Sequence, residues 1–283
     1  MPNSLLVNRG LISVSGPDAV SFLDNLLTVS VDGLQSGEAR YGALLTPQGK
    51  MIADGLIVAR GDGFLIDCPR VLAADFSRRL GFYKLRANVD VVNRSDDLAV
   101  LAAWADDGAP LQGVVRFTDP RLAALGDRIV VQSDKVPDLR APEADYHAHR
   151  IALGVPEGGH DFIYGDTFPH EADMDQLNGV DFKKGCFVGQ EVVSRMQHRG
   201  TARTRCVPLR FADGAKVPEG TEALAGQKPC GRIGSSLESG LAIGLLRLDR
   251  VADAIAAGEA LTADGHVFVV ERRDWMTFEV AGI

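Results

Sequence analysis

The segment from Asp181 to Gly200, D-F-K-K-G-C-F-V-G-Q-E-V-V-S-R-M-Q-H-R-G, constrains the fold more than any other part of the chain. Gly185 and Gly189 flank Cys186. Glycine in such places usually serves a positive φ or the close approach of another backbone. Residues 190–199 then carry an apolar stripe at helical spacing. The pattern predicts a tight loop that leads into a short helix.

Cys186 is therefore expected just before a helix N-terminus, with Lys183 and Lys184 beside it. The positive end of the helix dipole and two nearby ammonium groups both favour the thiolate form of a cysteine. The alternative is that Cys186 is a small buried apolar residue, as most free cysteines are. Both interpretations stay open, because exposure and thiol pKa separate a reactive cysteine from a packing one.

The same region is basic, although the whole chain has a net charge of −8. The overall charge argues against wholesale binding to nucleic acid or to a membrane. The local surplus of four positive charges, six Lys and Arg against two acids, predicts an anionic ligand or partner, or else a solvated basic face. The residues are Lys183, Lys184, Arg195, Arg199, Arg203 and Arg205, with Asp181 and Glu191 as the acids.

The cysteine spacing narrows the class of protein. The four cysteines, at positions 68, 186, 206 and 230, are too far apart for a C-x-x-C metal or redox motif, and no metal site is expected. No signal-peptide pattern and no run of eighteen apolar residues is present in this sequence. We expect a soluble, monomeric, cytoplasmic protein without a disulfide framework.

Two fold patterns follow one another along the chain. Between Met51 and Gln132 the predicted order is strand, helix, strand, strand, helix, strand, which is typical of a ferredoxin-like module. Its predicted elements are 64–68, 69–80, 87–93, 98–104, 120–125 and 127–132, with 51–60 as an additional strand on its edge. Past Ala202 we expect no helix but a small closed barrel of about six strands. These are 203–211, 231–235, 241–248, 260–261, 267–271 and 277–280.

Three acids crowd the segment that precedes Asp181, namely Glu171, Asp173 and Asp175. Helix capping and solvation explain most clusters of this kind. A ligand role for Glu171 is the alternative, because a carboxylate accepts hydrogen bonds from ring N–H groups.

Lys184 to Glu191, K-G-C-F-V-G-Q-E, resembles the K-G-C-[FY]-x-G-Q-E signature of the folate-binding YgfZ family. These proteins are relatives of the glycine-cleavage T-protein and act in iron–sulfur cluster assembly or repair. Four further segments resemble YgfZ-type proteins in the same order. They are L-T-P-Q-G-K-M at 45–51, R-I-A-L-G-V-P at 150–156, T-F-P-H-E-A-D at 167–173 and G-R-I-G-S-S at 231–236.

The resemblance implies an α+β fold of three domains, a T-protein-like cloverleaf around a central folate channel. Residues 1–48 and 142–202 would form a discontinuous folate-binding domain. Residues 49–141 would form the ferredoxin-like domain, and residues 203–283 the C-terminal β-barrel.

The resemblance also implies a ligand and partners. Tetrahydrofolate or a one-carbon derivative would occupy the channel, and Glu171 matches the T-protein carboxylate that binds the pterin ring. Cys186 would be the catalytic residue. Iron–sulfur proteins or assembly factors would be the partners, with tRNA-modifying enzymes among the clients and no membrane. The other implied ligand-binding residues are Lys184, Gly185, Gln190, Glu191, Arg195, Arg205 and Asp54.

One departure bears on activity. The T-protein has an Asp-Asp pair where this chain has Asp54-Gly55. The missing acid favours the iron–sulfur role over glycine cleavage and leaves open whether any reaction is catalysed. Two other functions stay open: a folate-dependent aminomethyltransferase or demethylase, and a non-catalytic module that holds RNA or protein on the basic patch of residues 183–205.

Overall fold

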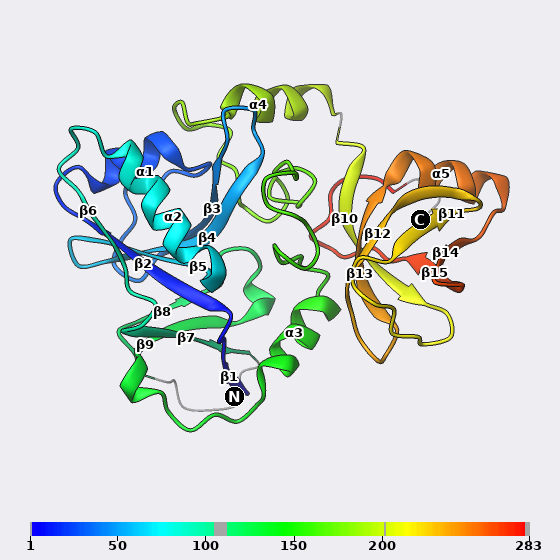
Figure 1. Cartoon of the computed structure of the whole chain (residues 1–283), viewed down its shortest axis with the longest axis horizontal. Helices are drawn as coiled ribbons and strands as arrows, with labels where there is room; N and C mark the ends of the chain where they lie inside the picture. The colour runs from blue at the N-terminus through cyan, green and yellow to red at the C-terminus, as the bar shows by residue number, and fades with distance from the viewer. Residues whose placement is uncertain (1, 105–111, 201, 281–283) are drawn as a thin grey trace. The chain divides into compact units, whose positions relative to one another are not determined.

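The computed structural model describes residues 2–104, 112–200 and 202–280 of the chain. The protein divides into two compact units. The first unit consists of residues 1–147 with 177–192, and the second of residues 148–176 with 193–283. Figure 1 shows their elements along the chain. None of the helices in the described ranges is both long and apolar enough to cross a membrane.

The first unit contains a five-stranded antiparallel sheet with the order β3-β4-β5-β2-β6. Its strands are β2 (Arg9–Ser15), β3 (Ala39–Leu45), β4 (Met51–Arg60), β5 (Gly63–Pro69) and β6 (Asp90–Asn93). The helices α1 (Ala19–Leu26) and α2 (Arg70–Tyr83) lie on one face of this sheet (Figure 1). They share one apolar core with it, to which α1 contributes Phe22 and Leu23 and α2 contributes Phe76.

This sheet corrects the strand assignment made from the sequence. The order β2-α1-β4-β5-α2-β6 has the ferredoxin-like arrangement, because β5 and β2 lie between β4 and β6. The prediction that 51–60 is an edge strand is wrong, since β4 pairs with β3 on one side and β5 on the other. The position of β4 in the sheet depends on the order in which the strands pair, and local sequence patterns do not encode that order. The predicted domain boundaries stay a prediction.

A second sheet in the same unit has the order β1-β7-β9-β8. Its strands are β1 (Asn3–Leu5), β7 (Leu98–Ala103), β8 (Val115–Thr118) and β9 (Asp127–Gln132). A short 3-10 helix at Ala123–Leu125 connects β8 to β9, and a second at Ser133–Lys135 follows β9. The helix α3 (Glu143–Ala152) follows. The sequence-based strands at 98–104 and 127–132 therefore belong to this sheet and not to the ferredoxin-like one.

Buried charges connect the two sheets of the first unit. Asp67 points away from α1 and α2, because its neighbours Ile66 and Cys68 belong to the helix-side core and side chains alternate along a strand. Its Oδ1 accepts a hydrogen bond from Arg9 Nε at 2.6 Å, and its Oδ2 lies 3.9 Å from Arg128 of β9.

Asp119 continues this network. Its two oxygens accept hydrogen bonds from Arg121 Nε and Nη2 at 3.0 and 2.8 Å, and Arg128 Nε donates to Oδ2 at 3.3 Å. Burial alone would raise the pKa of Asp119, but the attraction of Arg121 and Arg128 outweighs it and lowers the pKa to about 2. Both arginines also donate to the hydroxyl of Tyr146 on α3.

The second unit contains a closed six-stranded barrel with the order β10-β13-β12-β11-β14-β15. Its strands are β10 (Thr204–Phe211), β11 (Glu222–Ala225), β12 (Lys228–Ser236), β13 (Leu241–Arg247), β14 (Leu261–Ala263) and β15 (His266–Val270). The predicted α+β class with a C-terminal barrel is confirmed.

Two details of the barrel differ from the prediction. Residues 277–280 form no strand, and the sixth strand is β11 instead. A helix, α5 (Leu248–Ala257), packs on the barrel although none was expected. Its apolar residues Leu248, Val251 and Ile255 recur at helical spacing and join the barrel core, and Gly258 ends it in the left-handed conformation. These signals were present in the sequence, although no helix was predicted past Ala202.

Asp119→Asn should destabilise the protein by about 3 kcal/mol at pH 7, because it leaves two buried guanidinium groups without their carboxylate. The folded-state pKa of about 2 lies below the ordinary 3.8. The contribution of Asp119 is therefore complete above about pH 4 and is lost as the pH falls toward 2. Urea unfolding should be measured at pH 7, 5 and 3. The difference in the free energy of unfolding between wild type and variant should become smaller below pH 4.

The exposed carboxylate of Asp96 supplies the control. Asp96→Asn should change the free energy of unfolding by less than about 0.5 kcal/mol. A similar small effect for Asp119→Asn would show that the network does not hold the two sheets together.

Candidate functional site

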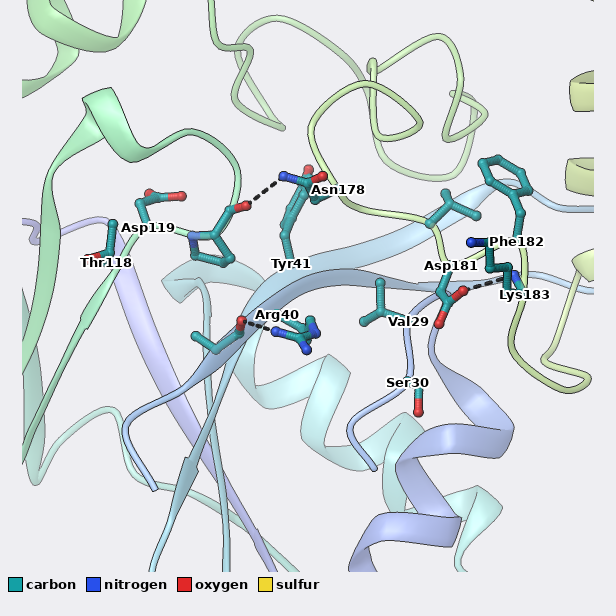
Figure 2. Close-up of a pocket in the computed structure, with 13 residues that line it drawn as sticks. Val29, Ser30, Arg40, Tyr41, Thr118, Asp119, Asn178, Asp181, Phe182 and Lys183 are labelled. Atoms are coloured by element: carbon teal, nitrogen blue, oxygen red, sulfur yellow. Dashed lines mark hydrogen bonds between the residues drawn. The ribbon is translucent and has the colours of Figure 1, made fainter. Parts of the chain in front are cut away.

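A pocket of about 690 Å³ opens on the first unit, and Figure 2 shows its lining. Three segments far apart in the sequence form it: residues 39–41 of β3, residues 118–120 at the end of β8, and residues 178–183 ahead of Cys186. Val29 and Ser30 complete the wall. We call it the Tyr41 pocket.

Tyr41 forms a rigid part of this wall. Its hydroxyl donates a hydrogen bond to Asp54 Oδ2 at 2.7 Å, and the Arg121 guanidinium lies 5.8 Å from its ring centroid. Burial and the nearby Asp54 carboxylate raise the pKa of Tyr41 well above its ordinary value. Tyr41 is therefore a neutral phenol. Asp54, predicted to bind the cofactor, is buried and is not among the lining residues.

Hydrogen bonds hold the third segment of the wall in place. The Asn178 side-chain amide donates to the Pro120 carbonyl at 3.1 Å, so it joins two of the three segments (Figure 2). Thr28 Oγ1 donates to the Gly179 carbonyl at 2.6 Å, and the Asp181 N–H donates to the Thr28 carbonyl at 2.9 Å. The chain thus enters the Lys184–Glu191 motif from a fixed position.

Lys184 anchors the motif itself. Its ammonium donates to the carbonyls of Asp24, Leu27 and Val29 at 2.7 to 2.8 Å, so all three donors are used at the C-terminal end of α1. A cation there also meets the negative end of the helix dipole. Burial lowers the pKa of Lys184, against the opposing pull of Asp24 and Asp181.

The two predicted special glycines differ. Gly189 has φ +81°, and a Cβ there would lie 2.6 Å from the Thr46 carbonyl oxygen, so both reasons for glycine hold. A Cβ at Gly185 would meet nothing within 4 Å, and its φ is not positive. Gly189 therefore fixes the loop against the turn after β3, whereas Gly185 has no such constraint.

Cys186 is exposed, whereas Cys68, Cys206 and Cys230 are buried. Burial raises the pKa of the Cys68 thiol to about 12 and that of Cys230 to about 11, and it raises that of Cys206 well above its ordinary value. The alternative that Cys186 is a buried packing residue is therefore wrong.

The helix that follows Cys186 is α4 (Gln190–Arg199), with the bounds that the sequence predicts. Gln190 is half-buried at its first position, and Glu191 and Arg195 are exposed. Their predicted ligand roles stay predictions. The side chain of Arg199 lies outside the described residues.

Glu171 lies in the second unit. Its Oε2 accepts a hydrogen bond from the Phe168 N–H at 2.8 Å, and its backbone carbonyl accepts one from the Cys206 N–H at 2.9 Å. The side chain is half-buried. One carboxylate oxygen thus stabilises a turn, which is the capping alternative, and the pterin role stays a prediction.

Arg205, predicted to bind the ligand, is a buried ion-pair partner. Its guanidinium donates to both oxygens of Asp175 at 2.6 and 2.9 Å and to Asp173 Oδ1 at 3.3 Å, and it lies 4.5 Å from the Phe278 ring centroid. Burial would lower the pKa of Arg205, but the two aspartates raise it above its ordinary value. Arg205 therefore stabilises the fold. Its ion pairs also account for Asp173 and Asp175, two of the three acids that crowd this segment.

Sequence reasoning missed Tyr41, Arg40 and Asp119 in the pocket. They come from segments that only the strand pairing brings together, so no local signal marks them. Among the described residues, no group of three or more His, Cys, Asp and Glu side chains could hold a metal ion.

Two family models match parts of the chain. Residues 7–105 match the GCVT N-terminal domain, and residues 203–278 match the CAF17 C-terminal beta-barrel domain. A crystal structure of the glycine cleavage system aminomethyltransferase T from Bartonella henselae has a TM-score of 0.75, covering 97% of this chain and 86% of that one. The identity of 18% means that the likeness shows the fold alone. The predicted T-protein-like fold is confirmed.

Curated relatives identify the family. The mitochondrial iron-sulfur cluster assembly factor IBA57 homolog of Pyricularia oryzae is 32% identical over 291 residues, covering 91% of this chain and 75% of the relative. The IBA57 of Mus musculus is 31% identical over 274 residues, covering 86% and 73%. The chain belongs to the IBA57 family of iron–sulfur cluster assembly factors. The Neurospora crassa homolog is 36% identical over 241 residues, and the match spans only 54% of its length.

This family assignment bears on two predictions. The iron–sulfur part of the predicted resemblance is confirmed at the level of the family, whereas membership of the YgfZ branch stays a prediction. The prediction of a cytoplasmic location is wrong by this comparison, since these IBA57-family relatives are mitochondrial by name. The lack of a signal-peptide pattern was weak evidence for a cytoplasmic location, because this sequence need not contain the signal that directs a protein to its compartment.

Lys184→Met should destabilise the first unit by about 2 kcal/mol, because three carbonyl groups lose a charged donor. Lys183→Met is the matched control, since the neighbouring Lys183 side chain is exposed and should change stability by less than about 0.5 kcal/mol. Urea unfolding at pH 7 measures both. Equal effects for the two variants would show that the three hydrogen bonds of Lys184 are not what anchors the motif.

Proposed function

We propose that this protein is an assembly factor for iron–sulfur clusters that uses the Cys186 thiol and binds reduced folate. Membership of the IBA57 family supports the first part. The observation that carries the proposal is the exposure of Cys186, the single exposed cysteine of the four. The loop that presents it is fixed by Lys184 and Gly189.

A thiolate is the form of cysteine that binds iron or attacks sulfur. One cysteine cannot hold a cluster by itself, because clusters need several ligands. Cys186 would therefore contribute one sulfur ligand to a cluster whose other ligands belong to a client or carrier protein. The buried Cys68, Cys206 and Cys230 cannot serve in this way without unfolding their strands.

The Tyr41 pocket has features that fit reduced folate. Its volume of about 690 Å³ lies within the range of small-molecule sites. Two cations, Arg40 and Lys183, line it and are exposed, and neither has a carboxylate partner within the described part of the chain. They would pair with the glutamate carboxylates of the ligand, while the carbonyl of Asn178 and the Asp181 carboxylate offer acceptors to its N–H groups. When bound, reduced folate supplies a carrier for a one-carbon unit.

The alternative of aminomethyl transfer is less well supported. The Asp54 carboxylate does not line the Tyr41 pocket, because it is buried and accepts a hydrogen bond from the Tyr41 hydroxyl. An acid cannot be added beside it, since a Cβ on Gly55 would lie 2.8 Å from Ile66 Cγ2 and 2.9 Å from the Asp67 carbonyl oxygen. RNA binding through the basic patch of residues 183–205 is also less well supported, because the charges of Lys184 and Arg205 are used in contacts within the chain.

The function is tested in a strain that lacks the gene. Its iron–sulfur enzymes should lose most of their activity, glycine cleavage should be unaffected, and the wild-type protein should restore the lost activities. Cys186→Ser should restore less than about a tenth of them, because a serine hydroxyl does not replace a thiolate ligand. Cys230→Ala, a change inside the barrel, is the matched control and should restore them fully. Full rescue by Cys186→Ser would refute the role of the thiol, and lost glycine cleavage would favour the transferase.

The folate proposal is tested by calorimetry with tetrahydrofolate under anaerobic conditions. The double variant Arg40→Ala, Lys183→Ala should weaken binding about tenfold, the scale of two exposed ion pairs. Glu171→Ala should weaken it by roughly 1.5 to 3 kcal/mol if this carboxylate binds the pterin.

The two sets of variants separate the two candidate positions for the ligand. An effect of Glu171→Ala alone would move the ligand away from the Tyr41 pocket. Absence of any binding heat from the wild-type protein would remove folate from the proposal and leave the cluster-assembly part untouched.

A further inference from the structure

The helix α2 and the two residues that follow it expose an unusual amount of apolar surface. Twelve large apolar side chains are exposed in the described chain, and four of them lie between positions 71 and 85. Val71 is 89% exposed, Phe82 66% and Leu85 90%, and Tyr83 is the fourth. Scattered exposed apolar residues are ordinary, whereas a group of this kind marks an interaction site.

These residues belong to the outer face of α2. Val71, Arg78 and Phe82 are separated by seven and four positions, so they lie on one side of the helix. The opposite side, with Phe76 and Leu80, is buried against the sheet. The exposed side is therefore a separate surface and not a poorly packed part of the core.

Leu85 adds a second, independent observation. Its φ is +43°, in the left-handed region that favours glycine and that a leucine adopts at a conformational cost. The position follows the end of α2, where glycine is the usual residue. The side chain is nevertheless almost fully exposed, so packing against the described residues does not offset the strain. Strain that the fold does not need points to a role outside it.

The surroundings of this apolar surface are basic. Residues 70–86 contain five Lys and Arg and one acid, and the nearby Asp90 and Asp96 leave a local surplus of two positive charges on a chain with a net charge of −8. Asp75 pairs with Arg78 and Arg79, Asp96 with Arg70, and Asp90 lies 3.8 Å from Lys84. Arg86 is exposed and has no such partner within the described residues.

Arg78 also orders the aromatic side chain beside it. Its guanidinium lies 5.6 Å from the Phe82 ring centroid and also pairs with Asp75. An aromatic ring fixed before binding loses less conformational entropy when it enters a pocket.

We propose that this surface, which we call the α2 patch (Val71, Arg78, Phe82, Tyr83, Leu85 and Arg86), docks an acidic protein that offers an apolar socket to Phe82 and Leu85. Arginine with aromatic residues is the composition of protein–protein interface centres. A phospholipid surface or RNA fits less well, because the Asp75 carboxylate is paired with Arg78 of the patch and the chain as a whole is acidic. The proposal does not depend on Cys186 or on folate.

The test places a photo-crosslinking residue at position 82 in living cells, with the exposed Val7 position as the control. The protein crosslinked from position 82 and not from position 7 is then purified, and calorimetry measures its affinity for the wild-type chain and for variants. Leu85→Ser and Arg86→Glu should each weaken binding about tenfold, as loss of an interface anchor does, and added salt should weaken the wild-type complex.

Leu85→Gly distinguishes docking from a role in folding. Glycine relieves the positive φ, so this variant should unfold at an equal or higher urea concentration than wild type and still lose binding. The proposal fails if position 82 gives no protein crosslink beyond the control, if the adduct is RNA or phospholipid, or if the patch variants bind as tightly as wild type. Lower stability of Leu85→Gly would show that Leu85 serves the fold.

Discussion

The buried carboxylate of Asp119 is the interaction on which the first unit most depends. It accepts a two-pronged pair of hydrogen bonds from Arg121 and a third from Arg128, and these arginines reach Tyr146 on α3. Taking such charges out of water is costly, and the cost is offset only while every partner is present. The network therefore specifies one arrangement of the two sheets more strongly than apolar packing would.

This arrangement positions the Tyr41 pocket. The Arg121 guanidinium lies 5.8 Å from the Tyr41 ring centroid, and Asp119 itself is one of the lining residues. The buried ion pairs of Asp119 and Arg121 therefore support this part of the pocket wall. A site on a rigid support can hold a ligand in a defined orientation.

Lys184 fixes the loop that carries Cys186, also through partly buried polar contacts. A lysine in a basic motif suggests an anion site, and the sequence was interpreted in that way. The structure instead directs its ammonium into three carbonyls at the end of α1. Lys184 therefore places Cys186 by anchoring the backbone, and the charge that was expected to act on the thiol is used inside the fold.

Local signals in the sequence were sufficient for some elements. The bounds of α4 followed from an apolar stripe and the glycines around it, and the barrel followed from a series of short strands with turns. The position of β4, the pocket around Tyr41 and the pairing of Arg205 with Asp175 could not be predicted, because each depends on residues distant in sequence. The helix α5 was missed although its periodicity was visible, since its setting among strands was given more weight.

The central claim is that this chain presents one accessible thiol on an anchored loop. Iodoacetamide labelling of the native protein at neutral pH, followed by peptide mass spectrometry, measures the four cysteines side by side. The account predicts that Cys186 is modified at least about a hundredfold faster than Cys68, Cys206 and Cys230, which react only after local opening. All four should react at similar rates in concentrated urea. A buried cysteine that reacts as fast as Cys186 in the native protein would contradict the account.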